Sequence, residues 1–155
     1  MSSCIKNEKF NDSYCQDIIL GKTKAKSALE LMQSRYYAYK NVNLEYIQKT
    51  QIDNWSKAQL DEVENWAKNS FWQHLEIINY SETEVEFKAY YIYEGRQELI
   101  HELSTFVKQG DNWIYKSGKL YDTKVNIARN SKCICGSGKK YKQCCLKFKQ
   151  LEVLR

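Results

Sequence analysis

The sequence of 155 residues predicts an α+β domain followed by a small metal-binding knuckle. In the first half of the chain, apolar residues recur every three or four positions, which is the period of an amphipathic helix. From Trp72 onward the pattern alternates every second position, which is the period of a strand. Four cysteines then fall within 13 residues near the C-terminus. A chain of this length is sufficient for one hydrophobic core with a small appendage.

Three helices are expected before the strands. Ser27 and Glu30 in the first, and Ser56 and Gln59 in the third, have the spacing of a capping box, which marks a helix N-terminus. The predicted helices cover residues 25–41, residues 44–50 and a segment that begins near Ser56.

Four strands are expected next, because the segments are rich in β-branched and aromatic residues. They cover residues 72–80, 84–93, 97–108 and 112–120. Gly95 and Gly110 lie between consecutive segments, where tight antiparallel turns require positive φ angles. The predicted architecture is therefore α+β, with three helices on one face of a curved antiparallel four-stranded sheet.

The composition indicates a cytoplasmic protein. No N-terminal stretch has the apolar core of a signal peptide, and no segment approaches the length that spans a bilayer, so integral membrane association is not expected. Cysteines in the cytosol stay reduced, so a cluster of them indicates metal or redox chemistry before disulfides. Motifs typical of phosphate-binding loops, serine hydrolases and metalloproteases do not occur, which favours a protein that is not an enzyme.

Positive charge is concentrated at the C-terminal end. Residues 132–155 contain seven Lys or Arg and one Glu, whereas the rest of the chain is close to neutral. A basic module on a neutral body suggests an anionic partner, such as an acidic protein surface, RNA or lipid headgroups. The alternative is that these lysines only keep the segment solvated.

The cysteines have the spacing of a closed metal site. Cys133 and Cys135 form one pair, Cys144 and Cys145 form the second, and a glycine-containing loop connects them. Zinc prefers four soft ligands at tetrahedral corners, and two thiolate pairs joined by one reversing loop supply them. Buried thiols or disulfides are the alternative, but the segment is too polar to form a core and a bond between adjacent cysteines would be strained. We therefore predict one structural zinc per chain.

The segment Cys-Ile-Cys-Gly-Ser-Gly-Lys-Lys-Tyr-Lys-Gln-Cys-Cys, residues 133–145, resembles the SEC-C motif, named for the C-terminal zinc module of the preprotein translocase ATPase. The resemblance implies a zinc-dependent docking module, since in the translocase this module contacts a chaperone, membrane lipid and the ribosome. A protein or ribosome-associated partner is therefore expected, with RNA as an alternative partner.

A second resemblance covers the rest of the chain. Four segments look like the bacterial YchJ-like family, whose middle domain resembles the nuclear transport factor 2 fold, a cone of helices against a curved sheet. These segments are residues 31–39, 72–77, 101–106 and 113–115. The expected organisation is a degenerate N-terminal SEC-C-like segment over residues 1–20, the cone domain over 21–125 and the SEC-C motif over 130–150. Cone domains of this kind often dimerise through the open face of the sheet, so a homodimer is also an expectation.

The family often carries a further SEC-C motif at its N-terminus, but here only Cys4 and Cys15 remain at comparable spacing. Two thiols cannot close a tetrahedral zinc site, which is why one zinc per chain is expected.

Three other residues are candidates for chemistry in the cone. Arg35 lies among helix aromatics and could meet a buried carboxylate such as Glu102 or Glu86, either as a structural ion pair or as the floor of an anion site. His101 precedes Glu102 in a predicted strand, so the two side chains are expected on opposite faces of the sheet. A cavity with convergent polar groups would favour a small-molecule enzyme or carrier, and a cavity filled by Tyr and Trp would exclude one.

Overall fold

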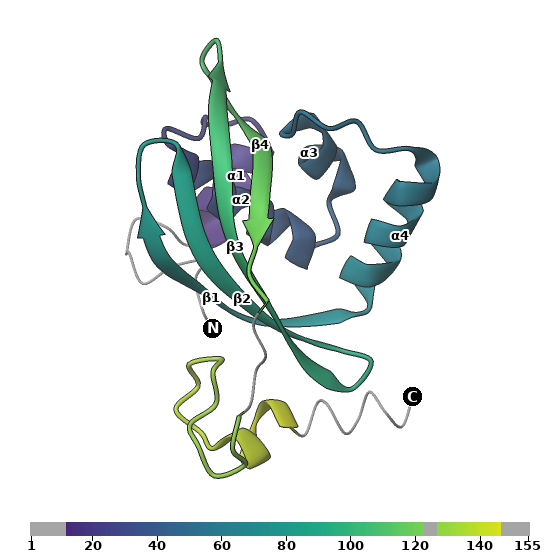
Figure 1. Ribbon diagram of the computed structural model, residues 1–155, viewed down its shortest axis with the longest axis vertical. Coiled ribbons are helices and arrows are strands. Elements are labelled where there is room, and N and C mark those ends of the chain that lie inside the picture. The colour runs from purple at the N-terminus through teal and green to yellow at the C-terminus, as the bar shows by residue number, and fades with distance from the viewer. Residues whose placement is uncertain (1–11, 123–126, 147–155) are drawn as a thin grey trace.

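The computed structural model describes residues 12–122 and 127–146. The described chain contains helices, then strands, then a short 3-10 turn (Figure 1): α1 (Asp12–Ile19), α2 (Ala28–Lys40), α3 (Leu44–Lys49), α4 (Lys57–Lys68), β1 (Ser70–Tyr80), β2 (Glu84–Tyr93), β3 (Arg96–Gln109), β4 (Asn112–Leu120) and η1 (Tyr141–Gln143). None of the helices in this part of the chain has the length and apolar character that a bilayer crossing requires.

The four strands form one antiparallel meander in the order β1-β2-β3-β4, as predicted. Glu94 and Gly95 form the two-residue turn between β2 and β3, with φ angles of 50° and 73°. Positive φ at both positions matches the right-handed twist of the flanking strands. Gly110, with a φ of 64°, serves the turn between β3 and β4. The sheet is strongly curved (Figure 1), and the α+β fold class is confirmed.

The predicted helix starts are also found. The Ser56 side chain accepts a hydrogen bond from the Gln59 backbone N–H, and the Gln59 side chain accepts one from the Ser56 N–H, so this capping box is complete. Ser27 likewise accepts from the Glu30 N–H at 3.1 Å. Glu30 instead uses its carboxylate to accept from the backbone N–H of Lys26, so only half of a capping box forms at α2.

The helix α1 was not predicted. Tyr14 of this helix donates a hydrogen bond of 2.8 Å to the Glu30 carboxylate, and burial together with this bond raises the pKa of Tyr14 to about 12. Cys15 and Ile18 are buried against α2 in the hydrophobic core. Cys15 is therefore placed as a core residue, while Cys4 lies outside the described residues.

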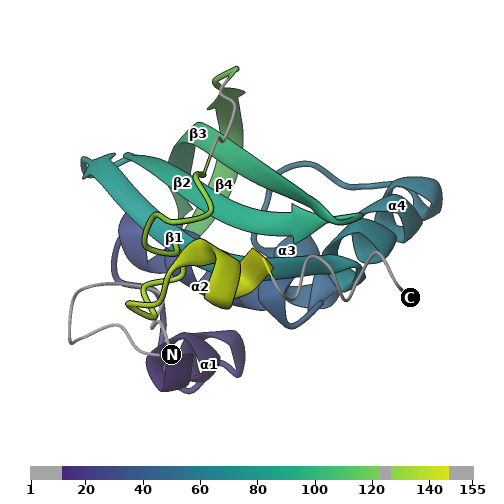
Figure 2. The same cartoon turned by 90° about the horizontal axis from the view of Figure 1, so that it is seen from below.

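Helices cover one face of the sheet, and the core lies between the two layers (Figure 2). Helix α2 lies against β1, β2 and β4. Because side chains alternate along a strand, Phe87, Ala89 and Tyr91 of β2 face the helices, and Ile92 faces the other side. The sheet therefore has a helix-covered inner face and an outer face that is available to another element.

Candidate functional site

The four predicted cysteines of the C-terminal segment come together in space. Their sulfur atoms all lie within 4.8 Å of one another, and the sulfurs of Cys135 and Cys144 are 3.5 Å apart. A tetrahedral zinc site with Zn–S bonds of about 2.3 Å has sulfur–sulfur edges of roughly 3.8 Å. None of the four is in a disulfide. The donor set therefore fits one tetrahedral metal ion, with all four positions supplied by the protein.

The loop between the two cysteine pairs reverses on glycines. Gly136 and Gly138 have φ angles of 84° and 82°, which residues with a side chain rarely adopt. The reversal is closed by a hydrogen bond of 2.8 Å from the Cys133 N–H to the Lys139 carbonyl. This backbone arrangement places the two pairs of sulfurs opposite each other.

The thiols differ in their tendency to ionise. Burial raises the pKa of Cys133 and of Cys145, because a low-dielectric environment disfavours an isolated thiolate. Burial acts in the same direction on Cys135. Hydrogen bonds from Ser137, Cys144 and Cys133 outweigh it and lower the pKa of Cys135 to about 7. A bound cation would supply the positive charge that the buried thiolates otherwise lack.

The cysteine cluster is packed against the outer face of the sheet rather than held apart from it. Cys133, Cys135 and Cys145 form a hydrophobic cluster with Ile92 of β2, which is completely buried, and Phe71 of β1 packs against the same cluster. Phe71 and Ile92 are paired across the two strands. The knuckle, residues 129–146, thus lies below the end of the sheet in Figure 1 and beside β1 in Figure 2.

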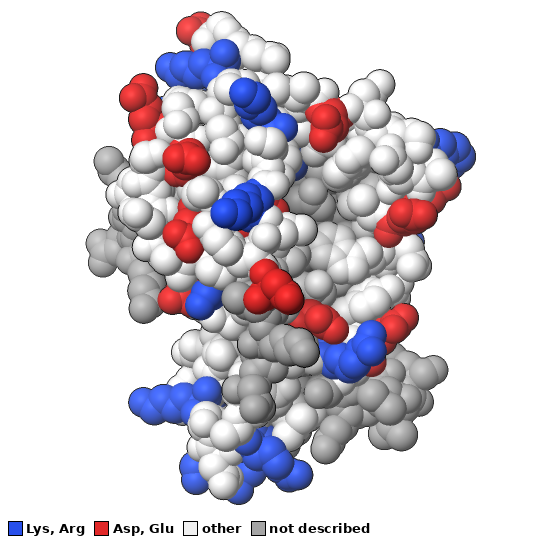
Figure 3. Space-filling view, viewed as in Figure 1, with Lys and Arg blue, Asp and Glu red and all other residues white. Residues whose placement is uncertain are grey.

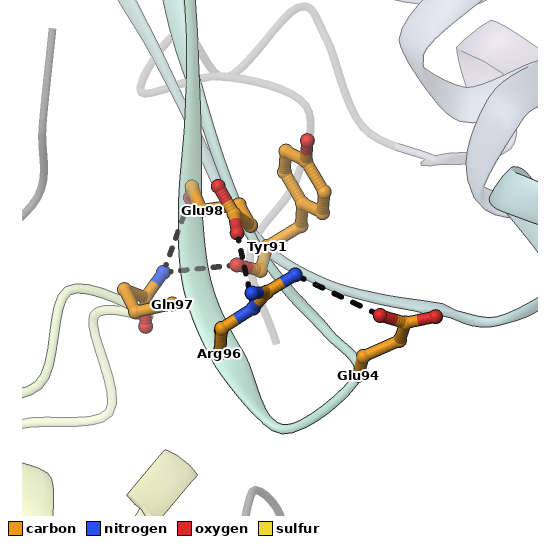
Figure 4. A network of polar contacts seen from close by, with 5 residues as sticks. All are labelled: Tyr91, Glu94, Arg96, Gln97 and Glu98. Carbon is orange, nitrogen blue, oxygen red and sulfur yellow. Dashed lines mark hydrogen bonds and ion pairs between the residues drawn. The ribbon is translucent and has the colours of Figure 1, made fainter.

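Two glutamines connect the knuckle to the strands. The Gln97 amide nitrogen donates to the Gln73 side-chain oxygen and to the Tyr91 carbonyl, and its own oxygen accepts from the Tyr141 hydroxyl at 3.4 Å. Figure 4 shows Gln97 on the side of β3 that faces the knuckle, with the Tyr91 ring on the other side. Gln73 is 2% exposed, and its Nε2 has no hydrogen-bond partner in the described structure; the Gln73 side chain opposes the rise that burial causes in the pKa of Cys145.

The turn beside Gln97 carries two ion pairs on its solvent side. Arg96 lies 3.7 Å from the Glu94 carboxylate and 3.8 Å from the Glu98 carboxylate (Figure 4). These side chains are largely exposed, and exposed pairs of this kind contribute little to stability. The buried glutamines and the apolar contacts therefore carry the attachment of the knuckle.

A second feature is a cavity of about 310 Å³ between the inner face of the sheet and helices α2 and α4. Figure 3 shows the surface hollowed between the sheet and α4. Half of the lining residues are aromatic, namely Tyr36, Tyr39, Trp55, Trp66, Trp72, Phe87, Phe106 and Tyr115. Trp55 and Trp66 are only partly buried and line this cavity. The cavity is lined, not filled, by aromatic residues.

Arg35 lies on the helix side of the cavity. Its Nη1 donates to the Ile47 carbonyl at 2.9 Å and to the Thr50 hydroxyl at 2.8 Å, and its Nη2 donates to the Gln51 side-chain oxygen at 3.1 Å. Burial lowers the pKa of Arg35, and nearby tyrosines and Glu102 oppose the shift. The guanidinium also lies 4.7 Å from the centre of the Tyr115 ring. The structure therefore fixes this cation by neutral acceptors and an aromatic face.

Glu102 lies on the sheet side of the same cavity. Its Oε1 accepts hydrogen bonds from the Ser104 hydroxyl at 2.6 Å and the Tyr115 hydroxyl at 2.9 Å. Burial raises the pKa of Tyr115, and Glu102 raises it further, so the hydroxyl stays a proton donor. A Cβ at Gly118 would collide with the Glu102 carboxylate, so glycine provides the space in which this network forms.

His101 is on the opposite face of the sheet from Glu102, as the alternation predicted. Its Nε2 lies 2.8 Å from the Glu86 carboxylate, and its ring packs on Tyr121 at 4.3 Å between centroids. Glu86 is therefore on the outer face and does not meet Arg35. Arg35 and Glu102 are brought to one cavity, whereas His101 is outside it.

Comparison with known proteins divides the chain into the same two parts as the structure, the cone and the knuckle. Residues 27–118 match the family model described as the YchJ middle NTF2-like domain, and residues 129–147 match the SEC-C motif. The chain belongs to the YchJ family. Its NTF2-like cone and its SEC-C motif are therefore confirmed.

Relatives and solved structures agree with this assignment. A UPF0225 protein of Geobacter sulfurreducens is 38% identical over an alignment of 146 positions, and the match covers 84% of this chain and 89% of the relative. The crystal structure of a SEC-C motif containing protein from Psychrobacter arcticus is 32% identical, with a TM-score of 0.56 over 94% of this chain and 95% of that one. The solution structure of RPA3114, a SEC-C motif containing protein from Rhodopseudomonas palustris, has a TM-score of 0.63 at 25% identity and covers 79% of this chain and 100% of its own.

Sequence reasoning found the cysteines but missed their support. Gln73, Gln97 and Ile92 had no signal that marked them, because each is an ordinary strand residue in the sequence. The alternation of β2 places Ile92 on the face away from the helices, and only the structure shows that Ile92 is buried there because the knuckle covers it.

Proposed function

We propose that the protein is a binding protein in which one structural zinc, held by Cys133, Cys135, Cys144 and Cys145, folds the knuckle onto the cone as a docking module. The observation that carries this proposal is the convergence of four sulfurs within 4.8 Å on the surface of the sheet. Four protein ligands leave no open position for water or substrate, which is typical of a structural site. Zinc suits this set of four thiolates better than hard cations do.

The partner of this module is proposed to be a protein or ribosome-associated surface of negative charge. Lys132, Lys139 and Lys140 of the knuckle are exposed, and Figure 3 shows Lys and Arg gathered at its free end. The cysteines themselves face the sheet, so the metal does not contact the partner and acts by fixing the loop that carries the lysines. Positive charge held on a rigid loop binds an anionic surface at a smaller entropic cost than the same charge on a mobile tail.

The first test is the metal content of protein purified without chelator, for which one zinc per chain is expected. Capture of partners by the wild type is then compared with capture by Cys144→Ser, and with Cys15→Ser as the control that removes a thiol outside the cluster. Loss of partners with Cys144→Ser alone supports the proposal. Equal capture by all three proteins contradicts it, and capture that nuclease abolishes assigns the module to RNA.

A second function is favoured by the cavity. Arg35, Glu102, Ser104 and Tyr115 converge on a space of about 310 Å³, which is near the lower end of the range of small-molecule sites. We propose that the cone binds a small ligand there, as a carrier or an enzyme. Ala89 lies in the cavity wall and is buried, so Ala89→Met would reduce the space. Calorimetric titration with a small aromatic molecule is expected to show binding that Ala89→Met removes.

A further inference from the structure

At the polar end of the cavity, the hydroxyl hydrogens of Ser104 and Tyr115 and three of the five N–H groups of Arg35 are already donated to protein atoms. Ser104 and Tyr115 both donate to Glu102, and Arg35 donates to Ile47, Thr50 and Gln51. The second carboxylate oxygen of Glu102, Oε2, accepts no hydrogen bond from any described residue. The Oε2 atom of Glu102 is therefore an acceptor that the cavity offers to a ligand.

The charges of the lining residues further restrict the class of ligand that the cavity can bind. Among the described residues that line the cavity, Arg35 and Glu102 are the only charged ones, so the lining is neutral overall. An anion or a cation would be attracted by one of these two groups and repelled by the other, and either ion would also lose its hydration on entering a mostly apolar site. An uncharged ligand avoids both costs.

The walls define the shape of the ligand. Trp66 and Trp72 meet edge to face with ring centroids 5.2 Å apart, and Tyr39 meets Trp66 in the same way at 5.9 Å. Phe87 faces these rings from β2. Aromatic walls fixed by one another favour a flat, apolar ring, and the volume of about 310 Å³ limits the ligand to a small one.

We infer that the cavity binds a small uncharged aromatic molecule whose hydroxyl or ring N–H donates a hydrogen bond to Glu102, with its ring between the aromatic walls. This inference rests on the proposed cavity function and is independent of the metal centre. Ser104 and Tyr115 hold the Glu102 carboxylate in place through their hydrogen bonds, in the space that the absent side chain of Gly118 leaves. The hydrogen-bond donor of the ligand would meet the carboxylate at this position.

The test uses a matched series of para-substituted toluenes and the full chain with its metal. Calorimetric titration compares p-cresol, which carries the donor, with p-methylanisole, in which a methyl group replaces the donated hydrogen. Charged controls are p-toluate and p-methylbenzylammonium. The expected affinity for p-cresol exceeds that for the other three by about tenfold or more, since a hydrogen bond to a charged acceptor is lost or a charge is buried in each.

The matching protein variants are Glu102→Gln, which keeps the shape of the side chain, and Glu98→Gln, a half-buried position on the same strand that does not line the cavity. Glu102→Gln is expected to remove the preference for p-cresol over p-methylanisole, and Glu98→Gln to retain it. Circular dichroism and metal content verify that both variants are folded. If all probes bind alike, the ligand class is wrong but the cavity function stands. If no probe binds, both are overturned.

Discussion

Gln73 is a residue of the sheet that interacts with the cysteine cluster. Its oxygen accepts a hydrogen bond from Gln97, its buried Nε2 has no hydrogen-bond partner in the described structure, and its side chain favours the thiolate form of Cys145 by opposing the rise in the pKa of that thiol. An N–H group aimed at a thiolate stabilises the charge that a metal-bound cysteine carries. Such an amide stabilises the thiolate when the metal is bound. When the metal is absent, the same amide is a buried donor without an acceptor, which is unfavourable.

We therefore expect Gln73→Leu to lower metal affinity by about 10-fold, because groups that support metal ligands typically contribute at least that much. The cone should stay folded, since Gln97 keeps its bond to the Tyr91 carbonyl. Competition with a chromophoric chelator measures the affinity. Gln33→Leu makes the same substitution at another buried glutamine, in α2, and should leave metal affinity unchanged. Equal affinities in the two variants would refute the role of Gln73.

The difference between what the sequence could and could not predict is clear at this scale. The cysteines could be identified because metal ligands of this class occur at short, recognisable spacings. Gln73 could not, because a β-bulge between Trp72 and His74 leaves it unpaired in the ladder with β2. A bulge of this kind has no reliable sequence signal. It turns the side chain of the bulged residue away from the direction that simple alternation along the strand predicts.

Helix α4 shows the same contrast for an element. Its start was predicted from Ser56 and Gln59 because a capping box is a local interaction that the sequence states directly. Helix α1 was missed because it has eight residues, too few to be stable alone, and depends on Cys15 and Ile18 packing under α2. The sequence predicts a helix whose N-terminus is marked by a local capping interaction. A short helix that is stabilised by tertiary contacts could be found only in the structure.

The capping box gives a prediction for α4. Ser56→Ala removes the acceptor for the Gln59 N–H and should reduce the free energy of unfolding by about 1 kcal/mol. Because Trp66 of this helix lines the cavity, faster hydrogen exchange at the start of α4 should accompany weaker binding of p-cresol. Chemical denaturation and exchange mass spectrometry measure the two effects. Ser56→Asp keeps a capping acceptor and should restore both, and a loss of the same size in Ser56→Asp would rule out the cap as the cause.

At the scale of the whole molecule, the sheet serves two sites through its two faces. The inner face and the helices form the cavity, and the outer face receives the knuckle at Phe71 and Ile92. The sequence predicted the two parts but not their contact, since the apolar residues of β1 and β2 alternate in the same way whether the outer face is open or covered. The aromatic residues of the cavity were likewise indistinguishable from core residues, because both have the same composition and period.

The contact between the parts predicts that the knuckle can be detached without removing its metal. Ile92→Asp places a carboxylate in the cluster with Cys133, Cys135 and Cys145, where burial of a charge is unfavourable, so the knuckle should leave the sheet. Residues 129–146 should then be cleaved much faster by protease while one metal per chain is retained. Ile78→Asp makes the same change at an isoleucine of β1 that is 41% exposed and should leave cleavage unchanged. If Ile92→Asp loses the metal together with the docked state, the cone is part of the metal site itself, and the knuckle cannot bind metal as an independent module.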